Sequence, residues 1–228
     1  GAFDITIAPL VNLWGFGPVE STRGNTPSAE EIEKAHGISG MGKLKLLSDG
    51  TIRKTHPGLQ VDLSALAKGY AIDKAAKSLD AHGVQHYLIE LGGELRAKGN
   101  GFKGEGWQVG LEHPQATTYD PHIHRTISLN NGAVATSGTY RLAFIDPADG
   151  RTYSHIIDPR TGRPVDHGLI AVSVLASTAM EADAWATALM VLGSEEGFRL
   201  AEDENLVALF VQRTPSGVNV KTTASFPQ

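Results

Sequence analysis

The feature that most constrains the fold of this chain is a series of tight-turn signals that separate short apolar segments. Asp49-Gly50, Asn130-Asn131-Gly132 and Asp149-Gly150 contain the residue types that adopt the positive φ angles of hairpin turns. A hairpin turn joins antiparallel strands, whereas parallel strands need a long crossover connection. Because few strand–helix–strand units accompany these turns, we predict an α+β fold in which antiparallel sheets pack with a few helices.

Two longer helices are expected between the strands. Residues 65–82 and 179–192 are predicted to be helical, and the segments end at Gly83 and Gly193 respectively. The other expected elements are a short helix that Ser28 opens and Gly37 closes, a short helix after Gly193, and strands at residues 43–47, 51–54, 86–91, 94–97, 107–111, 126–129, 133–136, 140–145, 152–157, 169–176, 206–212 and 218–223.

Composition narrows the function classes. The 228 residues suffice for one sizeable core or for two small lobes that share one. The net charge of −5, without any Lys/Arg-rich run, argues against a nucleic-acid partner, because binding phosphates needs a basic face. The absence of cysteine excludes disulfides, zinc–thiolate sites and cysteine nucleophiles. No apolar stretch reaches membrane-spanning length.

A carboxylate and a hydroxyl stand out on the second predicted helix. Asp183 and Thr187 are four residues apart, so they share one helix face, and their neighbours are mostly apolar. Burying a carboxylate without a partner is costly, and carboxylate and hydroxyl oxygens are the hard ligands that Mg²⁺ prefers. Spacing alone favours the structural explanation, in which Asp183 caps or salt-bridges and Thr187 bonds back to the helix.

Two further segments have polar residues beside predicted elements. Asp62 or Ser64 is expected to cap the helix at 65–82, and Lys68 in its first turn opposes the helix dipole but would favour a bound phosphate. An ordinary capped helix with a solvated Lys68 is equally compatible with this pattern. Gly92-Gly93-Glu94 is either a simple turn or a place where backbone approaches a flat ligand.

Histidines provide the remaining candidates. His155 ends a predicted strand, where it is either a general base or a structural residue that hydrogen-bonds within the following turn. No Gly-x-Ser-x-Gly elbow accompanies it, which argues against a serine hydrolase. His113, His122 and His124 are interpreted as solvated loop residues, because no acidic partner lies at metal-binding spacing.

Taken together, these segments resemble the ApbE family, the FAD:protein FMN transferases. The resemblance covers nearly the whole chain in the family's order. It rests on residues 1–4 and 9–17, 62–70, Gly92-Gly93-Glu94, Thr136-Ser137-Gly138, 154–159 with Thr161-Gly162, and Ala182-Asp183-Ala184 with Thr187.

The resemblance implies a role for each candidate residue. It implies that Asp183, Thr187 and the backbone carbonyl of Ala65 hold Mg²⁺, and it reverses the preference for a structural Asp183. It also implies that His155 is the base for an acceptor hydroxyl. The FAD contacts that it implies are Trp14, Gly15, Phe16, Asp62, Lys68 and Ile157.

The activity implied by the resemblance is Mg²⁺-dependent transfer of FMN from FAD to a Thr or Ser of an acceptor protein, with release of AMP. The acceptor would be a redox-pump or electron-transfer subunit. Two alternatives stay open at this point: an FAD pyrophosphatase that gives FMN and AMP, and a flavin-binding protein without turnover.

The resemblance also carries expectations about organisation. Residues 1–228 are expected to form a single ApbE-like, T-fold-like domain that lacks the family's N-terminal segment. That segment would carry a lipid anchor, absent from this chain and the only link to a membrane. The full-length protein would then be held at the periplasmic side of the bacterial inner membrane.

Overall fold

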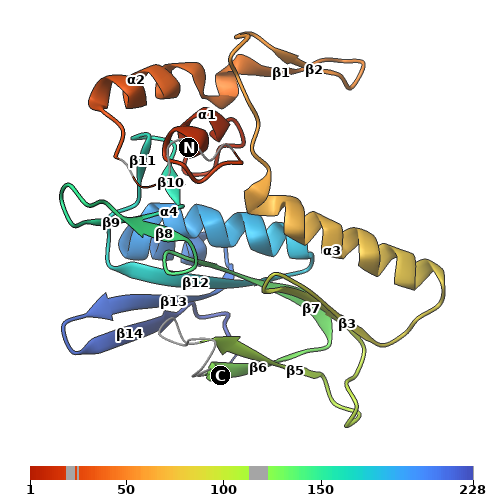
Figure 1. The fold of residues 1–228 in the computed structure, drawn as a ribbon. Coiled ribbons are helices and arrows are strands. Elements are labelled where there is room, and N and C mark those ends of the chain that lie inside the picture. Colours follow the sequence, from red (N-terminus) through yellow and green to blue (C-terminus); the bar gives the residue numbers. More distant parts are fainter. Residues whose placement is uncertain (19–23, 25, 113–122, 228) are drawn as a thin grey trace. The chain divides into compact units, whose positions relative to one another are not determined.

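The structure is a computed structural model that describes residues 1–18, 24, 26–112 and 123–227. The chain divides into two compact units (Figure 1). The small unit comprises Gly1–Leu63 and Thr139–His167, and the sheet unit comprises Ser64–Gly138 and Gly168–Gln228. Each unit is thus built from two segments of the chain. That the two units make one functional domain stays a prediction.

An antiparallel sheet forms the centre of the sheet unit. Its six strands follow the order β14-β13-β12-β7-β4-β3, and every neighbouring pair is antiparallel. This confirms the predicted α+β class. The strands are β3 (Tyr87–Leu91), β4 (Glu94–Lys98), β7 (Asn131–Gly138), β12 (Leu169–Ala176), β13 (Val207–Thr214) and β14 (Gly217–Thr222), and a separate hairpin joins β5 (Trp107–Glu112) to β6 (Ile123–Leu129).

Two helices pack on one face of this sheet (Figure 1). Helix α3 (Ser64–Ala81) is followed by Gly83 at φ +76°, and α4 (Ala179–Asp203) is interrupted at Gly193, where φ is 83°. The predicted stop at Gly193 and the short helix after it are therefore confirmed. Between sheet and helices, β12 is buried almost throughout, with Leu169, Val172 and Val174 wholly inaccessible to solvent.

Short elements around an aromatic core form the small unit. Leu10, Trp14, Ile32, Ala35 and Ile157 make up its buried cluster. The elements are helices α1 (Ala8–Leu13) and α2 (Ala29–Ile38), the 3₁₀ turn η2 (Met41–Lys43), and three antiparallel pairs: β1 (Leu44–Leu46) with β2 (Ile52–Lys54), β8 (Ala143–Ile145) with β9 (Thr152–Ser154), and β10 (Ile157–Asp158) with β11 (Arg163–Pro164).

The hairpins expected around Asp49-Gly50 and Asp149-Gly150 are present. Three local predictions are corrected. The strand expected at 152–157 is two strands, because the chain turns at His155 and Ile156. Helix α2 continues past Gly37 to Ile38. Asn130-Asn131-Gly132 is not a hairpin turn, because Asn131 and Gly132 belong to β7, which pairs with β4 and β12. The short α1 and β11 were not predicted.

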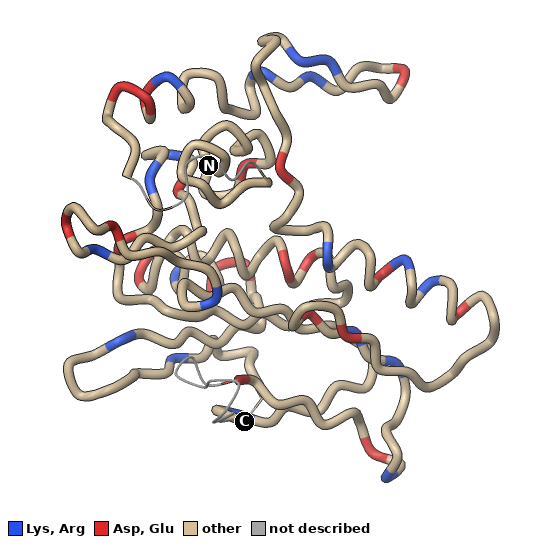
Figure 2. Tube along the Cα trace, in the orientation of Figure 1, with Lys and Arg blue, Asp and Glu red and all other residues tan. Residues whose placement is uncertain are grey.

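Charged residues of both signs occur in each unit (Figure 2). The β1–β2 hairpin carries Lys45, Arg53 and Lys54 on its strands and Asp49 in its turn. In the ranges that the structure describes, no helix is long and apolar enough to cross a membrane.

Candidate functional site

The N-terminal turn of α4 is held rigidly against α3. Thr178 caps α4 by accepting a hydrogen bond from the Glu181 amide at 3.2 Å. Asp73 of α3 accepts from the amides of Ala179 and Met180, each at 3.0 Å. A carboxylate at a helix N-terminus satisfies amides that have no partner within the helix. These contacts fix the position of the next turn of α4, which contains Asp183.

Asp183 is almost wholly buried, with an exposed fraction of 4%. Its Oδ2 accepts a hydrogen bond from the backbone amide of Gly69 in α3 at 3.3 Å. This approach requires glycine, because a Cβ at position 69 would lie 2.4 Å from the Ala179 carbonyl oxygen. The missing side chain of Gly69 therefore lets α3 and α4 meet closely enough for a backbone amide to reach the carboxylate.

A second carboxylate and one lysine lie close to Asp183. Lys68 of α3 forms an ion pair of 2.6 Å with Glu94 Oε1, and the Glu94 side chain is only 2% exposed. Burial raises the pKa of Asp183 to about 6, and the negative charge of Glu94 adds to this rise. The Gly69 hydrogen bond and the Lys68 charge act in the opposite direction. Asp183, Glu94 and Lys68 are called the charged cluster below.

The Gly92-Gly93 pair forms a turn, which was one of the two possibilities predicted from the sequence. Leu91 pairs with Glu94, so the two glycines form the whole loop of the β3–β4 hairpin. Both have positive φ, +63° and +101°, as a type I′ turn requires. The turn also touches the charged cluster, since a Cβ at Gly92 would lie 3.3 Å from Lys68 Cδ.

Thr187 lies one turn beyond Asp183 on α4. Its hydroxyl is 3.1 Å from the hydroxyl of Ser137 at the end of β7, so this hydrogen bond orients it. Ala65 is in the first turn of α3, and a helical carbonyl at position 65 points toward the amide of residue 69. Because the Gly69 amide contacts Asp183, the Ala65 carbonyl lies on the side of α3 that faces this carboxylate.

This set of donors fits a hard divalent cation. Asp183, Thr187 and the Ala65 carbonyl offer oxygen atoms only, which Mg²⁺ prefers. Asp183 is buried and accepts a hydrogen bond from the backbone amide of Gly69. Among the described residues, no three His, Asp or Glu side chains gather in a metal-binding cluster. A cation here would therefore depend on hydroxyl, carbonyl and water oxygens besides carboxylate.

The predicted residues of the small unit surround its aromatic cluster. Trp14 is fully buried, and its indole N–H donates to the Gly162 carbonyl at 2.9 Å. Phe16 is partly buried and contacts the ring of Phe144, at a centroid distance of 5.6 Å, and the edge of His155, at 6.3 Å. Trp14 is thus a core residue, whereas Phe16 lies toward the rim of the cluster.

Three further predicted residues lie in this unit. Ile157 is 4% exposed and belongs to the buried cluster. Gly15 has φ +75°, which turns the chain between Trp14 and Phe16. Asp62 is partly buried, and its amide donates to the Ile5 carbonyl at 2.8 Å. The role of each in binding FAD stays a prediction.

The backbone carbonyl of Leu142 orients His155. Its amide and its ring Nδ1 both lie 3.0 Å from the Leu142 oxygen. Because a carbonyl can only accept, Nδ1 carries a proton, and in the neutral ring the lone pair is then on Nε2. His155 therefore has the tautomer and the fixed orientation that a general base needs. His113 and His122 lie outside the described residues.

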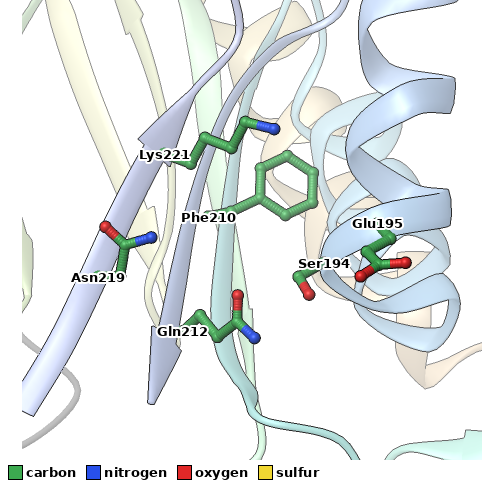
Figure 3. Close-up of a pocket in the computed structure, with 6 residues that line it drawn as sticks. All are labelled: Ser194, Glu195, Phe210, Gln212, Asn219 and Lys221. Atoms are coloured by element: carbon green, nitrogen blue, oxygen red, sulfur yellow. The ribbon is translucent and has the colours of Figure 1, made fainter. Parts of the chain in front are cut away.

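A separate cavity of about 190 Å³ lies at the far end of α4, beyond Gly193 (Figure 3). Lys221 on its wall has its Nζ 3.3 Å from the centroid of the Phe198 ring. None of the predicted residues contributes to it, and it is smaller than the pockets that hold drug-sized ligands. Its lining residues are Ser194, Glu195, Phe210, Gln212, Asn219 and Lys221.

Fold and site together define an antiparallel α+β protein with a buried oxygen-ligand cluster between two helices of its sheet unit. A sequence model described as the ApbE family matches residues 1–210, and the chain belongs to this family. The chain is 39% identical to the FAD:protein FMN transferase of Haemophilus influenzae and 40% identical to that of Vibrio cholerae. Each alignment covers 99% of this chain. It spans 65% and 66% of those two proteins.

Solved structures agree with this assignment. The flavin transferase ApbE of Vibrio cholerae superposes with a TM-score of 0.88 at 40% identity, over 99% of this chain and 70% of that one. The apo flavinyl transferase ApbE of Pseudomonas stutzeri gives 0.85 at 41% identity, over 99% and 68%. The ApbE protein of Thermotoga maritima gives 0.86 at 33% identity, over 99% and 71%. These comparisons confirm the ApbE-like fold.

Proposed function

We propose that this protein transfers FMN from FAD to a Thr or Ser hydroxyl of an acceptor protein and releases AMP. The observation that carries the proposal is the buried Asp183 with Thr187 on its own helix face, in a chain of the ApbE family. The relatives' names support the reaction. FAD is the substrate, and the acceptor is proposed to be a redox-pump or electron-transfer subunit.

The reaction is a phosphoryl transfer. The acceptor oxygen forms a bond to the phosphorus on the FMN side of the pyrophosphate, and the bond from that phosphorus to the AMP phosphate oxygen breaks. The electron pair leaves with AMP, and His155 Nε2 takes the proton of the hydroxyl. Such reactions depend on alignment and charge stabilisation more than on covalent catalysis.

In the sheet unit, we propose that Asp183, Thr187 and the Ala65 carbonyl hold Mg²⁺. When bound, Mg²⁺ supplies charge neutralisation at pyrophosphate oxygens. Asp183 provides the anionic ligand, and Ser137 keeps the Thr187 hydroxyl oriented through their hydrogen bond. Lys68 adds a positive charge next to this position and is proposed to contact FAD.

In the small unit, we propose that Phe16, Gly15, Asp62 and Ile157 contribute to FAD binding. Phe16 offers an aromatic ring at the rim of the cluster, and the positive φ of Gly15 brings backbone next to it. Trp14 would contribute indirectly, by supporting the neighbouring Gly15 and Phe16 from the core, because its side chain is wholly buried.

One experiment separates transfer from its alternatives. The full-length protein is incubated with FAD, Mg²⁺ and an acceptor protein that carries a Ser/Thr flavinylation site, and the products are followed by mass spectrometry and nucleotide chromatography. Covalent flavin on the acceptor together with AMP supports transfer. FMN and AMP without labelled acceptor would indicate a pyrophosphatase, and unchanged FAD would indicate a flavin-binding protein.

We also propose that the full-length protein is lipid-anchored at the periplasmic side of the bacterial inner membrane. The family resemblance supports this location, and the cysteine-free sequence is compatible with it. Sequencing the intact gene and fractionating the cells test it. A gene that encodes no lipoprotein leader, or a product recovered with the cytosol, would contradict this location.

A further inference from the structure

Glu94 has no function in the reaction as described so far. It is the first residue of β4, directly after the Gly92-Gly93 turn. With an exposed fraction of 2%, it is the most deeply buried carboxylate among the described residues. Buried carboxylates are ordinarily satisfied at both oxygens, because desolvating an unpaired charge is expensive.

The two oxygens of Glu94 have different surroundings. Oε1 accepts from Lys68 Nζ at 2.6 Å, whereas Oε2 is buried and has no hydrogen-bond partner among the described residues. Gly92 lies beside Oε2, since a Cβ at that position would be 3.7 Å away. The glycine thus leaves room next to an unpartnered anionic oxygen.

The charges of the cluster do not balance. Asp183 and Glu94 contribute two carboxylates, and Lys68, whose side chain is partly exposed, contributes the only ammonium that contacts them in the described structure. Lys68 and Gly69 are adjacent in α3, and they contact Glu94 and Asp183 respectively, so the two carboxylates meet the same turn of this helix. A buried excess of negative charge is relieved by a bound proton or by a further cation.

We infer that Glu94 is an additional ligand of the proposed cation, bound through Oε2 either directly or through one water of the ion's shell. Oε1 remains on Lys68. Because Mg²⁺ usually keeps several waters, a carboxylate slightly beyond direct reach still contributes through one of them. This inference rests on the proposed cation site at Asp183 and Thr187 and adds to it a second anionic residue from a different element of the sheet unit.

The test is cation binding without turnover. Mg²⁺ affinity is measured by titration calorimetry, and Mn²⁺ affinity by electron paramagnetic resonance, on the full-length protein without FAD. Glu94→Gln keeps the shape of the side chain and removes its charge. We expect at least about tenfold weaker binding, the usual effect of losing a supporting metal ligand. The matched control is Glu90→Gln, an exposed carboxylate of the same hairpin, which should bind within about twofold of the parent.

Lys68→Met distinguishes a ligand from a lysine anchor. If Glu94 acts on the cation, removing Lys68 takes a like charge away, so affinity should stay equal or increase while Glu94→Gln lowers it. If Glu94 serves only to hold Lys68, the two substitutions should change affinity in the same direction and by a similar factor. That second result would overturn the inference.

Asp183→Asn separates this inference from the proposed site. If Asp183→Asn abolishes cation binding and Glu94→Gln binds like the parent, the site stands and the role of Glu94 is refuted. If neither substitution changes affinity, both are refuted. Should Glu94→Gln fail to fold by circular dichroism, Glu94→Asp keeps the charge but withdraws it by one methylene. Weaker binding in that variant supports the inference, and parental affinity contradicts it.

Discussion

The two units differ in how their buried carboxylates are satisfied. In the small unit, the buried carboxylate of Asp146 accepts from the backbone amides of Thr26 and Ala148, and the Trp14 indole donates to Gly162, whereas the buried Ser154 hydroxyl has no hydrogen-bond partner among the described residues. In the sheet unit, Glu94 has a buried oxygen without a hydrogen-bond partner in the described structure, and Asp183 has a raised pKa. Carboxylates that are buried to similar depths in the two units therefore differ in whether their oxygens have hydrogen-bond partners.

This difference distinguishes buried groups that stabilise the fold from buried groups that remain available to a ligand. A satisfied buried group contributes to stability, and little remains for a ligand to do. An unsatisfied buried charge costs stability and persists where a ligand compensates it. This contrast supports the proposal that the charged cluster of the sheet unit binds a ligand, whereas the aromatic cluster around Trp14 serves mainly in packing. His155, at the rim of that cluster, is the exception.

The largest expected effect comes from removing Asp183, the proposed acidic ligand of the sheet unit. Asp183→Ala should lower Mg²⁺-dependent turnover by on the order of 10³-fold or more, because loss of a charge-stabilising element costs several kcal/mol of barrier. The fold should persist, since the substitution also removes a costly buried charge. Steady-state turnover and circular dichroism of the same sample check this. Full activity in Asp183→Ala would contradict the proposal that a required cation binds at that position.

The second prediction concerns the exception in the small unit. His155→Asn should lower transfer by roughly 10²- to 10⁴-fold, the usual contribution of a positioned base, while FAD and Mg²⁺ binding remain nearly unchanged. Asparagine keeps hydrogen-bonding capacity but cannot take a proton at neutral pH. Single-turnover rates and FAD affinity are measured on the full-length protein.

The pH profile provides the control for His155. The parent rate should rise with pH across the range in which histidines titrate, and the variant should lose this dependence. A structural histidine gives another pattern: lower thermal stability, weaker binding and an unchanged profile of the remaining activity. Parental transfer in the variant would exclude His155 from the mechanism.

The third prediction tests the structural role of the aromatic cluster. Trp14→Ala should lower the free energy of unfolding by about 3–5 kcal/mol, because it empties a wholly buried site. Trp14→Phe should cost less, since only the indole hydrogen bond and part of the volume are lost. Denaturant titrations measure both. If Trp14→Phe unfolds like the parent but binds FAD far more weakly, Trp14 contacts the substrate directly and the comparison between the units fails.

The sequence predicted those features that depend on local chemistry. The hairpin turn at Asp49-Gly50 and the helix break at Gly193 follow from backbone preferences of the glycines themselves. That Asp183 and Thr187 share a helix face follows from the helical period alone. The short helix α1 was not predicted, because it contains few residues and its N-cap, Ile7, offers no side-chain hydrogen bond, although Pro9 near its start is typical of a helix beginning.

What could not be predicted depends on contacts between distant segments. In the first turn of its predicted helix, Lys68 is unfavourably placed with respect to the helix dipole. The structure explains this position by an ion pair between Lys68 and Glu94, which lies 26 positions later in the chain. Glu94 itself had no distinguishing sequence pattern beyond its place after two glycines. The clash that makes Gly69 necessary arises only where α3 crosses α4. Each of these facts requires the tertiary fold.

The smallest expected effect is a pH dependence of stability in the metal-free protein. The pKa of Asp183 is about 6 in the folded state, above the ordinary aspartate value of about 3.9 that applies after unfolding. The folded state therefore binds this proton more tightly. The resulting stabilisation is fully present below about pH 4 and is lost as the pH rises through 6, at most about 3 kcal/mol in total.

Asp183→Asn isolates this contribution. Asp49, Asp80 and Asp146 have lowered pKa values, so their stabilisation is present at higher pH and decreases on acidification, which partly masks the effect in the parent. The difference between parent and Asp183→Asn cancels those groups. In the presence of EDTA, we expect the variant to gain stability relative to the parent between pH 4 and pH 7, measured by urea titration at each pH. A difference that stays constant over this range would show that Asp183 is already compensated within the sheet unit, and the contrast between the two units would then rest on Glu94 alone.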